Sequence, residues 1–203
     1  MNAIAATTAS KRRRSRKIPE ALIYEIVDGR PIYYKGYKDV INGKQQLESV
    51  MADSTLQTWL KTNLGFLLMQ LLKSKGYEIM SGELGILTTW GNRRGADVSI
   101  FREDALVLDA HYSKTAPEVI IEIDIQAELE DEDEMNYIAS KINDYHRFGV
   151  KRVIWIFTSI KKITVAEPGK PWMTYDWNEN IETLGGATFN LEKMLAAKQS
   201  KKA

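Results

Sequence analysis

Hydrophobic and polar positions along the first half of the chain predict a hairpin, a long helix and a second pair of strands. The stretch "ALIYEIVDGRPIYY" alternates on either side of Asp28-Gly29, which is a strong β-hairpin pattern. Leucines three or four positions apart then predict a helix over residues 54–75, which Ser54 or Asp53 would cap and Gly76 would end. The expected apolar stripe of this helix consists of Leu56, Leu60, Leu64, Leu67 and Leu71. Strand-like segments follow at 77–90 and 95–103, joined by a polar turn at 91–95.

The second half of the chain predicts a strand, a helix and a buried strand in that order. In "APEVIIEIDIQAE", residues 116–128, apolar residues alternate with Glu122 and Asp124. A helix is expected from about residue 132 to Phe148, and residues 153–157 are apolar without a break, as in a strand covered on both faces. Such a unit is a right-handed crossover almost without exception. With a peripheral hairpin and a closing helix after it, the pattern predicts an α/β fold with a mixed central sheet flanked by helices.

Length and composition narrow the class of protein. The 203 residues suffice for one folded domain, expected at 19–196 between a disordered basic N-terminal tail (1–18) and a flexible basic C-terminal tail (197–203). Because the chain has no cysteine, disulfides, thiolate zinc sites and a cysteine nucleophile are excluded, and a cytoplasmic location is expected. No apolar run approaches the ~20 residues that span a bilayer, so no membrane partner is expected.

Charge is distributed unevenly along the chain. Six basic residues lie between Lys11 and Lys17, whereas all 27 acidic residues come later, so the body of the protein is net acidic. A folded domain that held duplex DNA by charge alone should be basic. The basic N-terminal tail is either a contact to nucleic acid or a solvated segment, and the sequence leaves both interpretations open.

Three features of the predicted strands and helix point to a metal site. Asp97 lies in the strand-like "RGADVSIF", and Glu122 and Asp124 would share one face of their strand. Lys141 falls within the apolar stripe of its helix, where a lysine must reach water or meet an anionic partner. Asp97 and Glu122 on neighbouring strands could supply the oxygen ligands that Mg²⁺ or Mn²⁺ requires. A metal there would activate water for attack on a phosphodiester, and Lys141 could hold that water or neutralise charge on the phosphate.

Each of these features also has a purely structural interpretation. The two strand carboxylates could form the solvated face of a half-buried strand, and Asp97 could bond to the backbone near a turn. Lys141 could extend to water or pair with Glu134 or Asp144. The order strand Asp, strand Glu-x-Asp, helix Lys, buried strand is more specific than its parts and favours the metal site.

That order resembles the Uma-two family of restriction-endonuclease-like proteins, members of the PD-(D/E)XK nuclease superfamily. The resemblance covers residues 22–195: "YEIVDGRPI" is similar to the family's opening hairpin and "SGELGIL" to its Gly-Glu-x-Gly strand. "RGADVSIF" is similar to the segment with the first metal-binding aspartate, and "VIIEID" to the strand with the metal-binding glutamate. "KINDYHRFGVKRVIWIF" resembles the helix with a displaced active-site lysine and the buried strand after it. The superfamily lysine two positions after the glutamate is Asp124 here, so activity would depend on Lys141.

The resemblance implies a site, a cofactor and a partner. Asp97, Glu122 and the carbonyl of Ile123 would be the metal ligands, and Lys141 would complete the catalytic set with the two carboxylates. Additional candidates for the same pocket are Asp124, Glu83, Gln57 and Tyr145. The implied cofactor is Mg²⁺ or Mn²⁺, and the implied partner is nucleic acid, with DNA expected. Nuclease folds of this kind often pair, so a homodimer is a candidate assembly.

The sequence therefore predicts a metal-dependent endonuclease that hydrolyses nucleic-acid phosphodiester bonds. The alternative is a catalytically inactive protein of the same fold that binds nucleic acid or protein. The acidic body and the missing strand lysine favour the alternative, whereas Asp97, Glu122 and Lys141 favour the enzyme.

Overall fold

The computed structural model describes residues 18–89, 91–129 and 133–200, so almost all of the expected basic N-terminal tail lies outside the described residues. The described strands are β1 (Ile23–Val27), β2 (Arg30–Tyr33), β3 (Tyr77–Thr89), β4 (Asn92–Arg102), β5 (Val119–Ile123), β6 (Arg152–Phe157), β7 (Lys162–Ala166), β8 (Met173–Asp176), β9 (Ile181–Glu182) and β10 (Thr188–Phe189). The described α-helices are α1 (Tyr37–Ile41), α2 (Leu47–Met51), α3 (Thr55–Leu72), α4 (Glu134–Phe148) and α5 (Leu191–Ser200), with short 3-10 helices at Glu20–Leu22 and Lys73–Lys75.

Eight strands form one mixed sheet in the order β2-β1-β4-β5-β6-β7-β8, with β3 paired to β4 beside this path. Strands β5 and β6 are parallel, and α4 connects them as the predicted crossover. The remaining pairs of this sheet in the described residues are antiparallel, and β9 and β10 form a small separate sheet. The prediction of an α/β fold with a mixed central sheet is confirmed.

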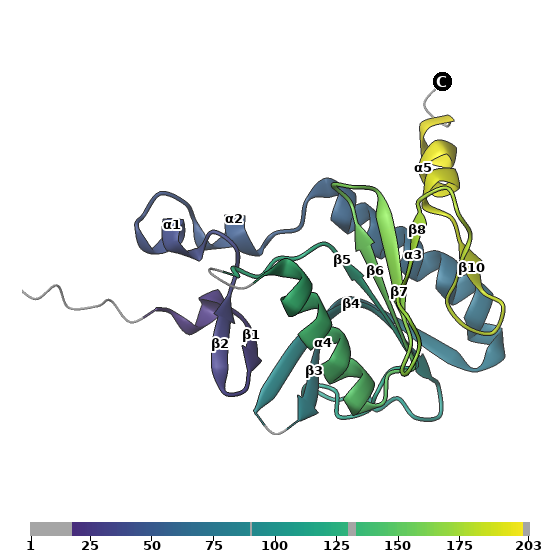
Figure 1. Cartoon of the computed structure of the whole chain (residues 1–203), viewed down its shortest axis with the longest axis horizontal. Helices are drawn as coiled ribbons and strands as arrows, with labels where there is room; N and C mark the ends of the chain where they lie inside the picture. The colour runs from purple at the N-terminus through teal and green to yellow at the C-terminus, as the bar shows by residue number, and fades with distance from the viewer. Residues whose placement is uncertain (1–17, 90, 130–132, 201–203) are drawn as a thin grey trace, which may run out of the picture.

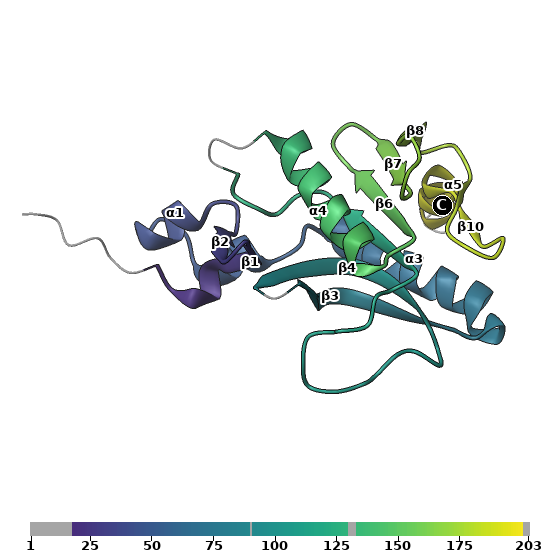
Figure 2. The same ribbon diagram turned by 60° about the horizontal axis from the view of Figure 1, so that its bottom comes forward.

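Helices cover both faces of the sheet (Figures 1 and 2). One apolar layer joins α3 and α5 to one face, and the other joins α4 to the opposite face. The buried leucines of α3 recur every fourth residue, at Leu60, Leu64, Leu68 and Leu72. The predicted stripe differs from this line at its C-terminal end, because it included Leu71. Leu71 lies to the side of the buried face and is 36% exposed.

Local sequence explains where several elements begin and end. Asp28 and Gly29 both adopt positive φ, as the tight turn between β1 and β2 requires. Ser54 caps α3, and Gln57 completes a capping box with it. Strand β4 begins at Asn92, three residues before the expected start, so Arg94 belongs to a strand and not to a turn.

The two ends of the described chain lie at opposite ends of the molecule (Figure 1). The β1–β2 hairpin and α1 lie at one end and α5 at the other in both views, and Figure 1 shows α2 beside α1. Helix α5 runs to Ser200 and so includes residues 197–200 of the expected C-terminal tail, while 201–203 lie outside the described residues. No helix among the described residues is long and apolar enough to cross a membrane.

Candidate active site

Asp97 and Glu122 lie opposite one another on adjoining strands. In the antiparallel pair of β4 and β5, Val98 is the partner of Ile121, so the next step of the register sets Asp97 opposite Glu122. Side chains opposite one another share a face of the sheet, with their Cβ atoms about 5 Å apart. Both are buried, with exposed fractions of 8% for Asp97 and 2% for Glu122. This burial excludes the interpretation of Glu122 as part of a solvated strand face.

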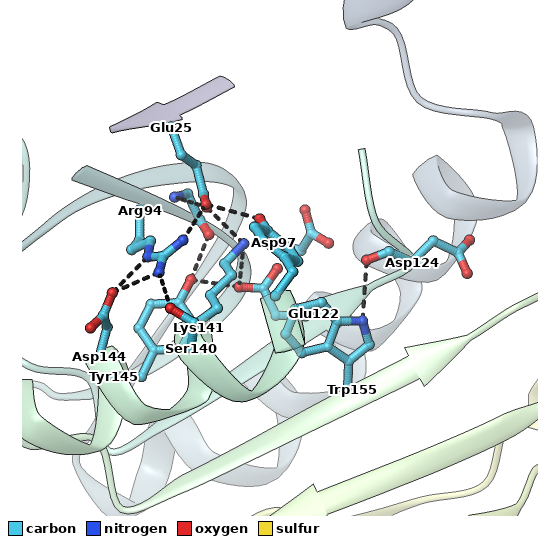
Figure 3. A network of polar contacts seen from close by, with 12 residues as sticks. Glu25, Arg94, Asp97, Glu122, Asp124, Ser140, Lys141, Asp144, Tyr145 and Trp155 are labelled. Atoms are coloured by element: carbon cyan, nitrogen blue, oxygen red, sulfur yellow. Dashed lines mark hydrogen bonds and ion pairs between the residues drawn. The ribbon is translucent and has the colours of Figure 1, made fainter. Parts of the chain in front are cut away.

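Glu122 is held by two residues of α4 (Figure 3). The Tyr145 hydroxyl lies 2.6 Å from Glu122 Oε1, and Lys141 Nζ lies 3.2 Å from the same oxygen. Burial raises the pKa of Glu122 to about 8, and the negative charges of Asp97 and Glu25 add to the rise against the opposing attraction of Lys141.

The Tyr145 hydroxyl provides an independent reason for a proton on Glu122. It lies 2.6 Å from the carbonyl oxygen of Gly95 as well as from Glu122 Oε1. A hydroxyl has one proton, so it cannot donate to two acceptors at once. A protonated Glu122 can donate to the Tyr145 oxygen while Tyr145 donates to Gly95, and both hydrogen bonds are then formed.

Lys141 is enclosed and shared between two carboxylates. Its side chain is 1% exposed, and its ammonium lies 2.9 Å from Glu25 Oε1 in addition to its contact with Glu122. Four aromatic rings lie within cation–π distance of the same ammonium: Tyr24, Tyr137, Tyr145 and Trp155. Its partners are therefore not Glu134 or Asp144, and it does not extend to water.

Glu25 and Arg94 complete the buried cluster, and sequence reasoning missed both. Glu25 Oε2 accepts from Arg94 and Tyr137, and Glu25 Oε1 accepts from the Gly95 backbone and Lys141. Arg94 also binds Asp144 at 2.7 Å. Burial alone would raise the pKa of Glu25, but attraction to Lys141 and Arg94 outweighs it and lowers that pKa.

Asp97 has a different set of partners. Its Oδ2 accepts a hydrogen bond of 2.8 Å from the Ile123 backbone, and its Oδ1 lies 2.7 Å from Lys61 Nζ on α3. Lys61 Nζ also lies 2.7 Å from Asp53 Oδ2. Burial raises the pKa of Asp97 despite the attraction of Lys61, whereas both carboxylates hold the pKa of Lys61 above its usual value against the effect of burial.

Asp124 and Gln57 lie apart from the opposed pair of Asp97 and Glu122. Strand β5 ends at Ile123, and Asp124 adopts a φ of 60°, so strand alternation does not carry Asp124 onto the face of Glu122. The Asp124 carboxylate accepts from the backbone and hydroxyl of Thr158, at 2.7 and 2.6 Å, and from the Gln57 amide at 3.2 Å. Its carbonyl accepts from the Trp155 indole (Figure 3).

Glu83 lies on the open side of the site. It lines a cleft of about 160 Å³ together with Ile23, Tyr24, Tyr34, Gly85, Arg93, Arg94, Gly95 and Tyr112. Burial raises the pKa of Glu83 against the attraction of Lys61, and the charge of Asp97 adds to the rise. Glu83 shares its cleft with Arg94 and Gly95, which belong to the buried cluster. Of the additional candidates, Glu83 and Tyr145 are therefore brought to the site.

The carboxylates Asp97 and Glu122 can ligate one hard divalent cation if one existing ion pair is broken. Five carboxylates of the linked clusters (Glu25, Asp53, Asp97, Glu122 and Asp144) face three basic side chains (Lys61, Arg94 and Lys141), which leaves an excess of negative charge. Within the described ranges no group of three or more His, Asp or Glu side chains could hold a metal ion. Mg²⁺ requires only one or two carboxylates, with water and phosphate oxygens completing its shell. Asp97 and Glu122 satisfy that need if Asp97 gives up its contact with Lys61.

The fold is that of a nuclease-like α/β protein. The crystal structure of a protein described as "a putative nuclease belonging to DUF820", from Anabaena variabilis ATCC 29413, superposes with a TM-score of 0.62. The match covers 85% of this chain and 89% of that chain at 13% identity, so it establishes the fold alone. The model of the Uma2 family, described as "Putative restriction endonuclease", matches residues 39–196, and the chain belongs to this family. Among curated proteins, none matches the chain.

Proposed function

We propose that the chain is a divalent-metal-dependent endonuclease that hydrolyses phosphodiester bonds of nucleic acid, with DNA as the expected substrate. The observation that carries this proposal is the opposition of two buried carboxylates, Asp97 and Glu122, within a cluster that has more acidic than basic side chains. Buried carboxylates repel one another and are costly to keep ionised, so a cation between them would stabilise the charged site.

Each residue has a defined part in this proposal. Asp97 and Glu122 would ligate Mg²⁺ or Mn²⁺, joined by the carbonyl of Ile123 at the end of β5. When bound, such an ion supplies an activated water and polarises a phosphoryl oxygen. Tyr145 fixes the orientation of Glu122 through the contact at Oε1. Lys141 is enclosed by rings and carboxylates, so we assign it to holding Glu122 in place and not to direct contact with substrate.

Cleavage of supercoiled plasmid in Mn²⁺ tests the proposal. Asp97→Asn and Glu122→Gln should each reduce the cleavage rate by about 100-fold or more, because each removes a ligand charge. Asp104→Asn is the matched control, since Asp104 is an exposed carboxylate just beyond β4 that pairs with Arg102. Equal activity in Asp97→Asn and wild-type protein would sink the proposal and identify the cleavage as contamination.

A second candidate function has one observation in its favour. Lys61 already neutralises Asp97, so the folded site is stable without a metal ion. A catalytically inactive protein that binds nucleic acid or protein would have this property. Binding of labelled DNA without cleavage in Mn²⁺, unchanged by Asp97→Asn, would favour that function over the nuclease.

A further inference from the structure

Lys61 occupies a position between two carboxylates that belong to different elements. Asp53 precedes α3 and Asp97 lies within β4, and each places one oxygen 2.7 Å from Lys61 Nζ. The Lys61 side chain is only 10% exposed, so the contact is not a loose surface ion pair. The Asp53 carboxylate is fixed from a second side by the Gln126 amide. The ammonium therefore stands where a cation bridging these two carboxylates would stand.

The hydrogen bonds of Asp97 determine which of its oxygens a divalent ion could bind. Asp97 Oδ2 is engaged by the backbone N–H of Ile123, which belongs to the sheet and is not free to move away. Oδ1 has no backbone donor among the described residues and is the oxygen more open to an ion, and Lys61 holds it. A divalent ion on Oδ1 would share that oxygen with an ammonium, and two positive charges on one oxygen repel. Lys141 raises a smaller difficulty, because it contacts the ligand Glu122 at Oε1, and an ion can use Oε2 of that carboxylate.

We propose that Lys61 is the resident cation of the site: it joins Asp53 to Asp97 in the metal-free protein and must leave Asp97 Oδ1 before a divalent ion binds there. This inference rests on the proposed metal-dependent function and adds a residue that controls how readily the metal is taken up. The lysine side chain has a flexible four-carbon stem, so the ammonium can move away while α3 stays in place. Once released, Lys61 carries a positive charge beside the site, where an anionic substrate would be attracted.

Mn²⁺ alone, without nucleic acid, is the probe. Lys61→Met removes the charge and keeps most of the length of the side chain, so titration calorimetry should show a Kd for Mn²⁺ about tenfold or more below that of the wild type. Lys44→Met is the matched control, because it removes one positive charge from an exposed pair with Asp39. Its Kd should stay within about twofold of the wild type.

Thermal unfolding gives a second measurement on the same proteins. Without metal, Lys61→Met should melt at a lower temperature than the wild type, because two carboxylates lose their shared partner. Saturating Mn²⁺ should then raise its melting temperature by more than it raises that of the wild type. Lys61→Gln removes the charge but keeps a hydrogen-bond donor. It provides the comparison if the methionine variant does not fold.

The outcomes separate this inference from the proposed function. If Lys61→Met and Lys61→Gln bind Mn²⁺ no more tightly than the wild type, while Asp97→Asn abolishes binding, the metal site stands and the role of Lys61 is overturned. If none of these proteins binds Mn²⁺, both the metal-dependent function and the inference fail. Tighter binding in both Lys61 variants, lost again when Asp97→Asn is added, is the result expected.

Discussion

Glu25 of β1 and Arg94 of β4 form an ion pair of 2.8 Å in which neither side chain is exposed. The pair fastens the N-terminal hairpin to the strand that carries Asp97. Both oxygens of Glu25 accept two hydrogen bonds each, from Arg94, Tyr137, Gly95 and Lys141, so the buried carboxylate is fully satisfied. The hairpin is thus part of the support of the candidate active site and not a peripheral addition.

Replacing Glu25 with glutamine should lower the free energy of unfolding by about 3–5 kcal/mol, because it leaves buried cations short of a partner. Urea denaturation at neutral pH measures this loss. Glu20→Gln is a suitable control, since Glu20 is an exposed carboxylate just before the same strand. A loss below about 1 kcal/mol in Glu25→Gln would mean that the ion pair is not formed in solution.

The pKa of Glu122 predicts how stability depends on pH. In the folded protein this pKa is about 8, above its ordinary value of 4.5, so the native state holds the proton more tightly than the unfolded chain does. The stabilising contribution of that proton is complete below the ordinary pKa and is lost as the pH rises to about 8. Glu122→Gln lacks this titration, and its amide N–H keeps a donor for the Tyr145 oxygen, as the protonated carboxyl does. Its free energy of unfolding, relative to the wild type, should therefore rise between pH ~5 and ~8.5.

Denaturation curves of both proteins at several pH values decide this point. A relative stability that stays constant over the range would show that Glu122 titrates in its ordinary range. The expected result also implies that the metal-free protein holds Glu122 protonated at neutral pH, so a divalent ion that binds there would release a proton.

Periodicity in the sequence predicted the elements that bear the site, but not the ion pairs within it. The hairpin, α3, the β5-α4-β6 crossover and the positions of Asp97 and Glu122 follow from apolar spacing. Arg94 was missed because "GNRRG" is polar and was assigned to a turn, whereas β4 begins at Asn92. Glu25 was missed because a charged residue in a short alternating strand is ordinarily solvated.

Lys61 is the residue that the sequence could have revealed. Lys141 was singled out because it falls within the apolar stripe of its helix. Lys61 does so equally, because it lies three positions before Leu64 and seven before Leu68. Its partners could not be predicted: Asp53 was considered as a helix cap, and Asp97 comes from a strand far along the chain. Side chains that meet across different elements leave no periodic pattern.

Asp124 should prove structural. Asp124→Ala removes the carboxylate that binds Thr158 and places alanine at a φ of 60°, so the free energy of unfolding should fall by about 2–3 kcal/mol. Asp124→Asn should lose less, because asparagine tolerates positive φ and retains an acceptor. Neither change should alter the Kd for Mn²⁺ in calorimetry by more than about twofold. Loss of Mn²⁺ binding with little loss of stability would instead make Asp124 a ligand.

Tyr145→Phe tests whether the orientation of Glu122 matters for metal binding. The change removes the only hydroxyl that contacts Glu122 Oε1 among the described residues and leaves the ring in the layer beneath α4. Because a partner that orients a ligand contributes to the affinity for the ion, the Kd for Mn²⁺ should rise by about 10–100-fold.

Tyr112→Phe is the matched control for this change, because Tyr112 lines the adjacent cleft and is half exposed. It should bind Mn²⁺ like the wild type. The losses of Mn²⁺ affinity in Tyr145→Phe and Glu122→Gln also test whether Glu122 ligates the ion. If it does, the loss in Tyr145→Phe should be smaller than the loss in Glu122→Gln, and it should vanish when Glu122→Gln is already present. Losses of affinity that add in the double variant would mean that Tyr145 acts on the site by a route other than Glu122.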